Sequence, residues 1–199
     1  MSNLNFLHSG GNKVTLSAPT SDPSSNPNFK LPQADGSSGQ FLKTDGSGAL
    51  SFANTYGPAF KAYRSSSLSI SHNSNTTVVF QTEVFDTDNC YNNSNGVFTP
   101  NKAGYYYVHF SMRIDLVSAD HLFQARINSG SSGANYIGID QRFNKSSNAN
   151  NSASVSVLHA FNGSGDSVFE QAYQNSGYTN TILGNLHETW FEAHWVRPL

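Results

Sequence analysis

The clearest pattern in the chain is a strict alternation of apolar and polar residues between Tyr105 and Asp115. Successive side chains of an extended strand point to opposite faces. One face of this segment is apolar and carries Tyr106, Val108, Phe110, Met112 and Ile114. The other face carries Tyr107, His109, Ser111, Arg113 and Asp115. We therefore expect a central β-strand that turns its apolar face into a core.

Further runs of β-branched and aromatic residues predict strands before and after this segment. They cover residues 78–85, 122–128, 136–143, 154–161, 168–173 and 189–196. Turn-forming sequences such as Asn95-Gly96, Asn162-Gly163 and Ser176-Gly177 separate them. Many short strands at even spacing are typical of an antiparallel sandwich or barrel, so the predicted fold class is all-β.

The first 56 residues have a different character, with short apolar islands separated by prolines and by Asp35-Gly36 and Asp45-Gly46. We read both dipeptides as tight turns, in which Gly supplies positive φ and Asp bonds its own backbone. We place a boundary near Gly57–Pro58, between an extended, β-rich N-terminal segment (residues 1–56) and a head (residues 57–199). The segment has too few large apolar residues to fold alone. It is either a flexible linker or a segment that pairs with other copies or a docking surface, and the regular islands favour pairing.

Composition narrows the classes of function. Charged residues make up 12% of the chain and the net charge is −2, which argues against a nucleic-acid binder because such a protein needs a basic face. No apolar run approaches the roughly 18 residues of a membrane helix, so membrane insertion is not expected. Cys90 is the single cysteine, and the first 15 residues lack the pattern of a secretory signal. We expect the chain to fold in a reducing cytoplasm.

Fixed spacings after Phe80 connect Asp86, Tyr91, Phe98, Gly104, Tyr106 and Phe110. This pattern resembles the C1q domain, with one departure at Val108, where that family usually has Phe. Phe60-Lys61-Ala62-Tyr63 and Thr189-Trp190-Phe191 extend the resemblance over about residues 58–199. The resemblance implies a ten-stranded jelly-roll sandwich of the C1q/TNF type that assembles as a tight homotrimer.

Tyr105-Tyr106-Tyr107 places aromatic rings on both faces of the central strand. A strand in such a trimer has the core on one side and a neighbouring subunit on the other, whereas a monomer would leave one face in water. We expect interface burial; two exposed Tyr rings are the alternative, because exposed aromatic residues are common. The residues predicted for the core and trimer interface are Phe80, Tyr91, Phe98, Gly104, Tyr105, Tyr106, Tyr107, Phe110, Trp190 and Phe191.

The stretch from Lys30 to Phe52 resembles a segment near the start of structural proteins of marine bacteriophages, and the collagen-like repeats of animal C1q proteins are absent. This resemblance implies a virion surface protein, assembled in the host bacterial cytoplasm, whose residues 1–56 bind other virion proteins. We expect a non-enzymatic homotrimeric short fibre or spike whose head binds the host surface or glycans. The alternatives are a capsid or tail decoration or cement protein that binds only virion proteins, and a cellular adhesin of the C1q type.

The sequence contains no catalytic or metal-binding motif. The seven histidines never occur as His-x-His or His-x3-His, and no Gly-x-Ser-x-Gly elbow is present. We therefore expect no enzymatic activity, no cofactor and no metal centre. Relatives of the C1q type often bind calcium through loops, so the resemblance leaves Asp86, Asp88, Asp115, Asp120 and Asp140 as candidate calcium ligands. Stabilisation of turns is the favoured alternative for these residues.

Candidate binding residues come from polar loops expected around residues 89–95, 129–136, 143–152 and 174–181. Loops rich in Asn, Ser and Tyr suit hydrogen-bonded contact with sugars, and three copies would add avidity. The predicted binding residues are Asn144, Ser147, Asn148, Asn150, Tyr136 and Tyr178. The alternative is that these loops are polar turns without a ligand.

Overall fold

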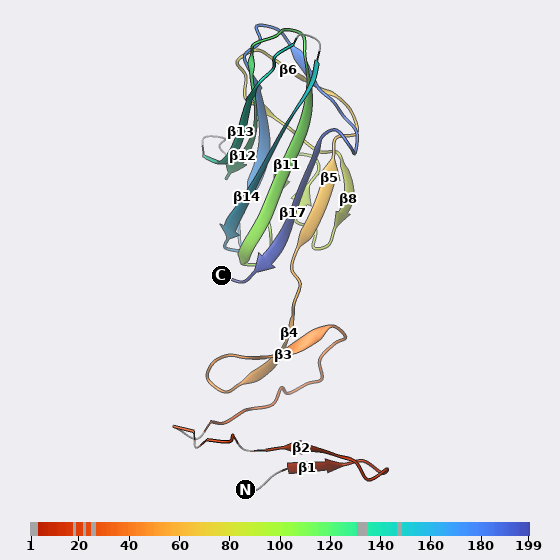
Figure 1. Cartoon of the computed structure of the whole chain (residues 1–199), viewed down its shortest axis with the longest axis vertical. Helices are drawn as coiled ribbons and strands as arrows, with labels where there is room; N and C mark the ends of the chain where they lie inside the picture. The colour runs from red at the N-terminus through yellow and green to blue at the C-terminus, as the bar shows by residue number, and fades with distance from the viewer. Residues whose placement is uncertain (1–3, 18, 22, 25–26, 131–134, 147–148) are drawn as a thin grey trace. The chain divides into compact units, whose positions relative to one another are not determined.

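The computed structural model describes residues 4–17, 19–21, 23–24, 27–130, 135–146 and 149–199, without the side chains of residues 149 and 150. The described residues form β-strands and no helices (Figure 1). The chain divides into two compact units, residues 1–55 and residues 56–199. We call the first unit the front segment and the second the head.

The head is a sandwich of two antiparallel sheets. The first sheet has the strand order β6-β16-β11-β17-β5-β8, and β14 also pairs with β11. Its strands are β5 (Ala59–Tyr63), β6 (Leu68–Ile70), β8 (Thr82–Asp86), β11 (Gly104–Leu116), β14 (Ala149–Phe161), β16 (Asn180–Ile182) and β17 (Trp190–Arg197). The second sheet has the order β13-β12-β15-β10-β9, and β7 pairs with β15. Its strands are β7 (Thr76–Thr77), β9 (Tyr91–Asn92), β10 (Val97–Phe98), β12 (Leu122–Ser129), β13 (Tyr136–Phe143) and β15 (Val168–Gln174).

This architecture confirms the predicted all-β class. The described residues of the head form thirteen strands rather than the ten implied by the resemblance, because β6, β7, β9, β10 and β16 are pieces of two or three residues. The polar stretch expected as a loop over residues 143–152 is also shorter than predicted. Residues 149–152 belong to β14, where their backbones pair with residues 113–116 of β11.

The core lies between the sheets and is centred on β11. Burial along β11 alternates, and Tyr106, Val108, Phe110, Met112 and Ile114 are fully buried, on the face that the sequence pattern indicated. Their partners from the second sheet include Phe123, Ala125 and Ile127. At one end of the sandwich the rings interlock: the Phe60 ring lies 4.7 Å from those of Phe98 and Phe191, between centroids. Aromatic pairs of this kind add to the free energy gained from burying their area.

The predicted strand over residues 78–85 is wrong in its first half. Val78 and Phe80 are fully buried, but the regular strand begins only at Thr82. The Val78 amide donates to the Glu170 carbonyl, and the Phe80 amide and carbonyl both bond the Tyr91 hydroxyl. The segment crosses from β7 in the second sheet to β8 in the first. Its apolar residues therefore fill the core of the sandwich without belonging to a ladder.

Gly104 and Asp86 have structural roles that explain their place in the sequence pattern. A Cβ atom on Gly104 would lie 2.1 Å from the indole nitrogen of Trp195, so only Gly fits beneath that ring. The Asp86 carboxylate accepts a hydrogen bond from the Tyr91 amide at 2.7 Å. This bond fixes the turn that leads from β8 to β9.

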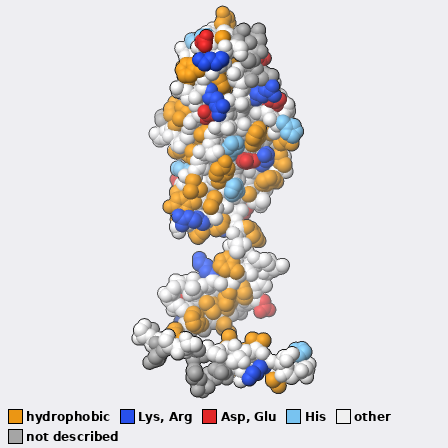
Figure 2. Space-filling model, viewed as in Figure 1, with side chains coloured by type: hydrophobic (Ala, Val, Ile, Leu, Met, Phe, Trp, Pro, Cys, Tyr) orange, Lys and Arg blue, Asp and Glu red, His pale blue; other side chains and the backbone are white. Residues whose placement is uncertain are grey.

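The front segment consists of two hairpins. One joins β1 (Leu4–Leu7) to β2 (Lys13–Leu16), and the other joins β3 (Gln40–Thr44) to β4 (Leu50–Asn54). In the second hairpin, the Asp45 carboxylate accepts hydrogen bonds from two backbone amides in the turn, as predicted. Large apolar side chains stay exposed throughout this unit, and Leu7 and Leu31 are each 77% exposed (Figure 2). A unit with so much uncovered apolar surface has no core of its own.

Candidate assembly face and binding residues

The outer face of the first sheet carries an aromatic surface across three neighbouring strands. We call it the aromatic face and define it by Tyr105, Tyr107 and His109 of β11, Ser156 and Leu158 of β14, and Trp190 and His194 of β17. The strand registers place these side chains on one side, because cross-strand partners share a face. Figure 2 shows His and hydrophobic side chains gathered over these strands in the lower half of the head.

The rings of the aromatic face lie in a connected array. The Tyr107 and His109 rings are 6.2 Å apart and nearly parallel, and the His194 ring is 5.4 Å from Tyr107. The Trp190 ring lies 6.0 Å from His109 on the other side. Tyr107 and His109 are half-buried, whereas Leu158 beside them is 64% exposed. The face therefore presents ordered, partly uncovered rings to whatever lies outside it.

Charged groups border the aromatic face in pairs. Lys61 of β5 forms a 2.8 Å ion pair with Glu192 of β17, and its ammonium lies 5.4 Å from the Trp190 ring centroid. Arg113 contacts both carboxylate oxygens of Glu188 at 2.7 Å. Paired charges beside aromatic rings are typical of the rim of an interface, where the charges stay hydrated.

His109 and Ser156 lie as close together as the base and the nucleophile of a hydrolase. His109 Nδ1 lies 2.9 Å from Ser156 Oγ, the separation of a base and a hydroxyl nucleophile. The Tyr107 hydroxyl donates to the same Ser156 oxygen, and the Glu192 carboxylate across the strand from His109 is held by Lys61. Neither the orienting acid nor a free hydroxyl of a triad is therefore in place. Burial lowers the pKa of His109, with Glu192 raising it and Lys61 lowering it to smaller extents.

Of the loop residues predicted to bind a ligand, the three whose side chains are described do not come together in one site. Asn144 is only 1% exposed, which corrects the expectation that it is a surface residue. Its amide donates to the Ser118 carbonyl at 2.5 Å, and its carbonyl oxygen accepts from the His121 amide at 2.9 Å. Asn144 thus ties two loops together, because a buried amide is stable only when its hydrogen bonds are made.

Three other predicted residues, Ser147, Asn148 and the side chain of Asn150, lie outside the described part of the chain. Tyr178 is 59% exposed in the loop between β15 and β16. Tyr136 is 46% exposed and begins β13, so it lies at the opposite end of that strand from the loop that contains Asn144. The two described tyrosines and Asn144 therefore come from separate parts of the head.

Tyr136 instead covers Arg126, a residue that sequence reasoning did not single out. The guanidinium of Arg126 lies 4.7 Å from the ring centroid of Tyr136 and 4.8 Å from that of Tyr173. It also donates to the Tyr136 hydroxyl and to the Asn75 side chain. Only the pairing of β12 with both β13 and β15 brings these rings to one guanidinium. No local sequence signal could have found this cluster.

The acidic residues considered for calcium are dispersed. Asp86 caps the turn described above, and Asp140 bonds the Arg142 side chain and the Ser154 amide. Asp120 adopts a positive φ of 60° in the loop between β11 and β12. In the described residues, no three His, Cys, Asp or Glu side chains come together in a way that could hold a metal ion. The same residues include no helix that is long and apolar enough to cross a membrane.

Two stacked antiparallel sheets with this strand order define the jelly-roll class of C1q and TNF proteins. The chain belongs to the C1q domain family, whose family model matches residues 59–191. A comparison with solved structures finds the globular domain of zebrafish complement 1qA at 20% identity and a TM-score of 0.50, covering 72% of this chain and 99% of that one.

Members of the TNF class have similar structures at lower identity. Eiger TNF from S. frugiperda is 9% identical with a TM-score of 0.51, and the match covers 72% of this chain and 95% of that one. Murine APRIL is 13% identical with a TM-score of 0.52, over 70% of this chain and 98% of that one. No curated protein matches the sequence. These likenesses establish the fold of the head, and homotrimers are typical of proteins with it.

Proposed function

We propose that the chain is a non-enzymatic, homotrimeric virion surface protein, a short fibre or spike whose head binds the host surface or its glycans. The observation that carries the proposal is the aromatic face. Its tyrosine, histidine and tryptophan rings are ordered but partly uncovered, and Leu158 projects beside them. A surface of partly uncovered aromatic rings with paired charges at its border is typical of a contact with a neighbouring subunit.

The front segment supports a second contact, with the particle. Its hairpins expose apolar side chains on both strands, including Phe6 at 54% and Leu42 at 50%. Such side chains gain free energy only when another surface covers them. Other virion proteins would cover them, and the three copies of the trimer would present this docking segment three times. The likeness of residues 30–52 to phage structural proteins is the reason for choosing a virion.

Trimer formation is tested on the full chain by sedimentation velocity, where we expect about three times the mass of the 21.6 kDa chain. The double substitution Tyr107→Ser and Leu158→Ser should shift the sedimenting mass toward that of one chain. The near-ultraviolet circular dichroism spectrum should remain that of a folded protein. Tyr178→Ser removes an exposed tyrosine away from the aromatic face and serves as the matched control. A wild-type chain that sediments as a stable monomer would refute the proposed assembly.

A decoration or cement protein is the competing function, because uncovered apolar hairpins suit capsid or tail contacts equally well. Binding of the purified full chain to host cells distinguishes the two. Saturable binding that is lost when surface polysaccharide is stripped supports attachment. No binding to host cells, together with particles that fall apart when the protein is removed, supports the decoration role. We expect neither role to need a cofactor or bound calcium, so chelation should leave host binding unchanged.

A further inference from the structure

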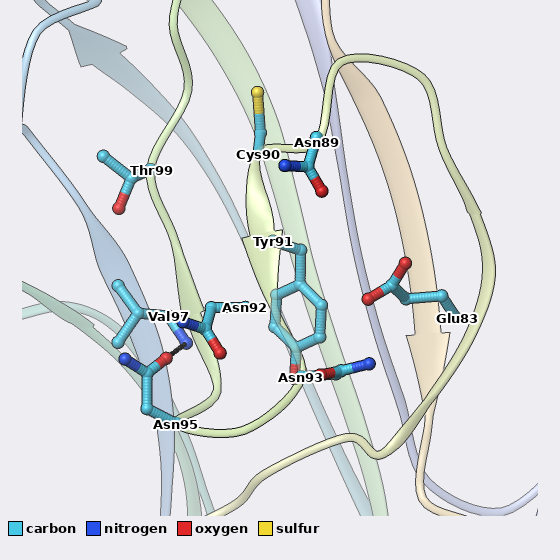
Figure 3. A pocket seen from close by; sticks show the side chains of 9 residues that line it. All are labelled: Glu83, Asn89, Cys90, Tyr91, Asn92, Asn93, Asn95, Val97 and Thr99. Atoms are coloured by element: carbon cyan, nitrogen blue, oxygen red, sulfur yellow. Dashed lines mark hydrogen bonds between the residues drawn. The ribbon is translucent and has the colours of Figure 1, made fainter.

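A polar pocket opens at the free edge of the sandwich, between β8 of the first sheet and β9 of the second. Both strands are the last of their sheets, so no ladder of backbone hydrogen bonds joins the two layers there. The pocket has a volume of about 490 Å³ and is lined chiefly by Glu83, Asn89, Asn92, Asn93 and Asn95, with Tyr91 at its centre (Figure 3). Its size is within the range of sites for small organic ligands.

Glu83 enters the pocket from β8. It pairs across the strands with Ala62, which is fully buried, so the Glu83 side chain points to the inner side of the sheet at its open edge. Glu83 is exposed, and none of the ion pairs among the described residues involves its carboxylate. In Figure 3 it faces Tyr91 from the side opposite Val97 and Thr99. A carboxylate accepts hydrogen bonds only, and an unpaired one is open to hydroxyl groups of a ligand.

The asparagines supply donors on the other walls. Asn92 and Asn95 each accept a hydrogen bond from the backbone amide two residues later, at 2.9 and 3.0 Å. Those bonds fix the side chains and leave their NH₂ groups as donors. Asn89 adopts a positive φ of 54°, a conformation that Asn tolerates well. Turn formation therefore explains Asn89, Asn92 and Asn95, but it does not explain Glu83 or Asn93.

The back of the pocket is rigid. The Tyr91 ring is only 5% exposed and stacks on Phe60 with 4.8 Å between centroids. Its hydroxyl bonds the Phe80 amide at 3.0 Å and the Phe80 carbonyl at 3.1 Å. Gly96, with a φ of 81°, closes the turn against the backbone of residues 78 and 79. A pre-organised site loses less entropy when a ligand binds.

The chemistry of the lining selects one class of ligand. Carboxamides and a carboxylate together offer both donors and acceptors, which is what neighbouring hydroxyl groups of a pyranose require, since each hydroxyl donates and accepts. The unpaired Glu83 charge, with Asp86 and Asp88 on the adjacent turn, repels anionic sugars. We propose that this edge pocket is the head's sugar-binding site and that it takes a neutral hexose unit, with Glu83 and Asn93 as its ligand-contacting residues. This inference rests on the proposed binding of host glycans.

The test uses the full chain and a panel of free sugars: glucose, galactose, mannose, glucuronate and sialic acid. Saturation-transfer NMR detects binding, and titration calorimetry gives the affinity. We expect at least one neutral hexose to bind and both anionic sugars to fail. Glu83→Gln and Asn93→Ala should each lower the affinity for that hexose by about tenfold or more, because each removes or neutralises a hydrogen-bond partner. Asn162→Ala changes an exposed turn asparagine in the β14–β15 loop and is the matched control.

Three results would overturn the assignment: no neutral hexose binds, an anionic sugar binds as well as the best hexose, or the hexose affinity survives both pocket substitutions. Binding of the same chain to host cells is measured in parallel. If the wild-type chain and the pocket variants bind cells equally well, the assignment of the pocket as the sugar site is wrong and the proposed attachment function stands. If no form of the chain binds cells or sugars, both fail. Unchanged thermal melting of the variants shows that any lost affinity does not arise from unfolding.

Discussion

Glu170 of β15 is an acidic residue whose carboxyl lies inside the sandwich. Its side chain is fully buried and faces the core beside Ile127 of β12. Neither carboxyl oxygen has a hydrogen-bond partner among the described residues. Burial raises the pKa of Glu170 well above its usual range. The folded head therefore holds this carboxyl protonated at pH values where the unfolded chain has released the proton.

The size of the effect follows from proton linkage. The unfolded chain loses the Glu170 proton near pH ~4.3, and each pH unit from there up to the folded pKa lowers the free energy of unfolding by about 1.4 kcal/mol. The stabilisation from the protonated carboxyl is thus complete at acid pH and is lost as the pH rises through the folded pKa. At pH 7 the loss is at most about 4 kcal/mol, since that pH lies roughly 3 units above the unfolded value.

Glu170→Gln removes the titration and keeps the size of the side chain. We expect the free energy of unfolding of the variant, minus that of the wild type, to rise by about 1.4 kcal/mol per pH unit above pH ~4.3 and then level off. Urea unfolding at one fixed protein concentration, repeated from acid to neutral pH, measures this difference. Glu83→Gln, which removes an exposed carboxyl on β8, controls for the loss of one negative charge. A difference that stays constant with pH would show that folding does not raise the pKa of Glu170.

Three further predictions test the core, the aromatic face and the front segment. Phe110→Ala should lower the free energy of unfolding by about 3–5 kcal/mol because the ring is fully buried. An unchanged melting temperature would show that the Phe110 ring does not lie in the core. Burial lowers the pKa of His109, so its protonation at acid pH should loosen the trimer; His109→Gln should flatten that dependence in sedimentation, and equal dissociation of both forms would contradict it. Deleting residues 1–55 should leave a trimeric head that no longer enters particles, and incorporation of the truncated protein would refute the docking role.

The sequence alone determined the two faces of β11. Side chains alternate along any extended strand, whatever its neighbours, so the positions of Tyr106 and Tyr107 on opposite faces followed from local geometry. The sequence also predicted a boundary near Gly57–Pro58, because prolines and turn dipeptides break the apolar residues before it into short islands. Long and strongly patterned strands are predictable for this reason.

Short connecting segments were less predictable than long strands. The apolar run at Val78 and Phe80 looks like a strand, yet it crosses the core between sheets, where its backbone bonds the Glu170 carbonyl and the Tyr91 hydroxyl. Asn144 looks like an exposed loop residue, yet its amide is buried. Composition indicates that a side chain is polar, but not whether its hydrogen bonds are made with water or within the protein.

Tertiary structure alone decided where the unpaired groups lie. Glu170 lies between Phe169 and Gln171 in β15, and only the packing of the two sheets shows that its carboxyl faces the core with no hydrogen-bond partner among the described residues. Glu83 and Asn93 are ten residues apart and meet only because β8 and β9 are the last strands of different sheets. Backbone periodicity is a property of neighbouring residues, whereas an edge pocket or a buried charge depends on which distant segments the sheets bring together.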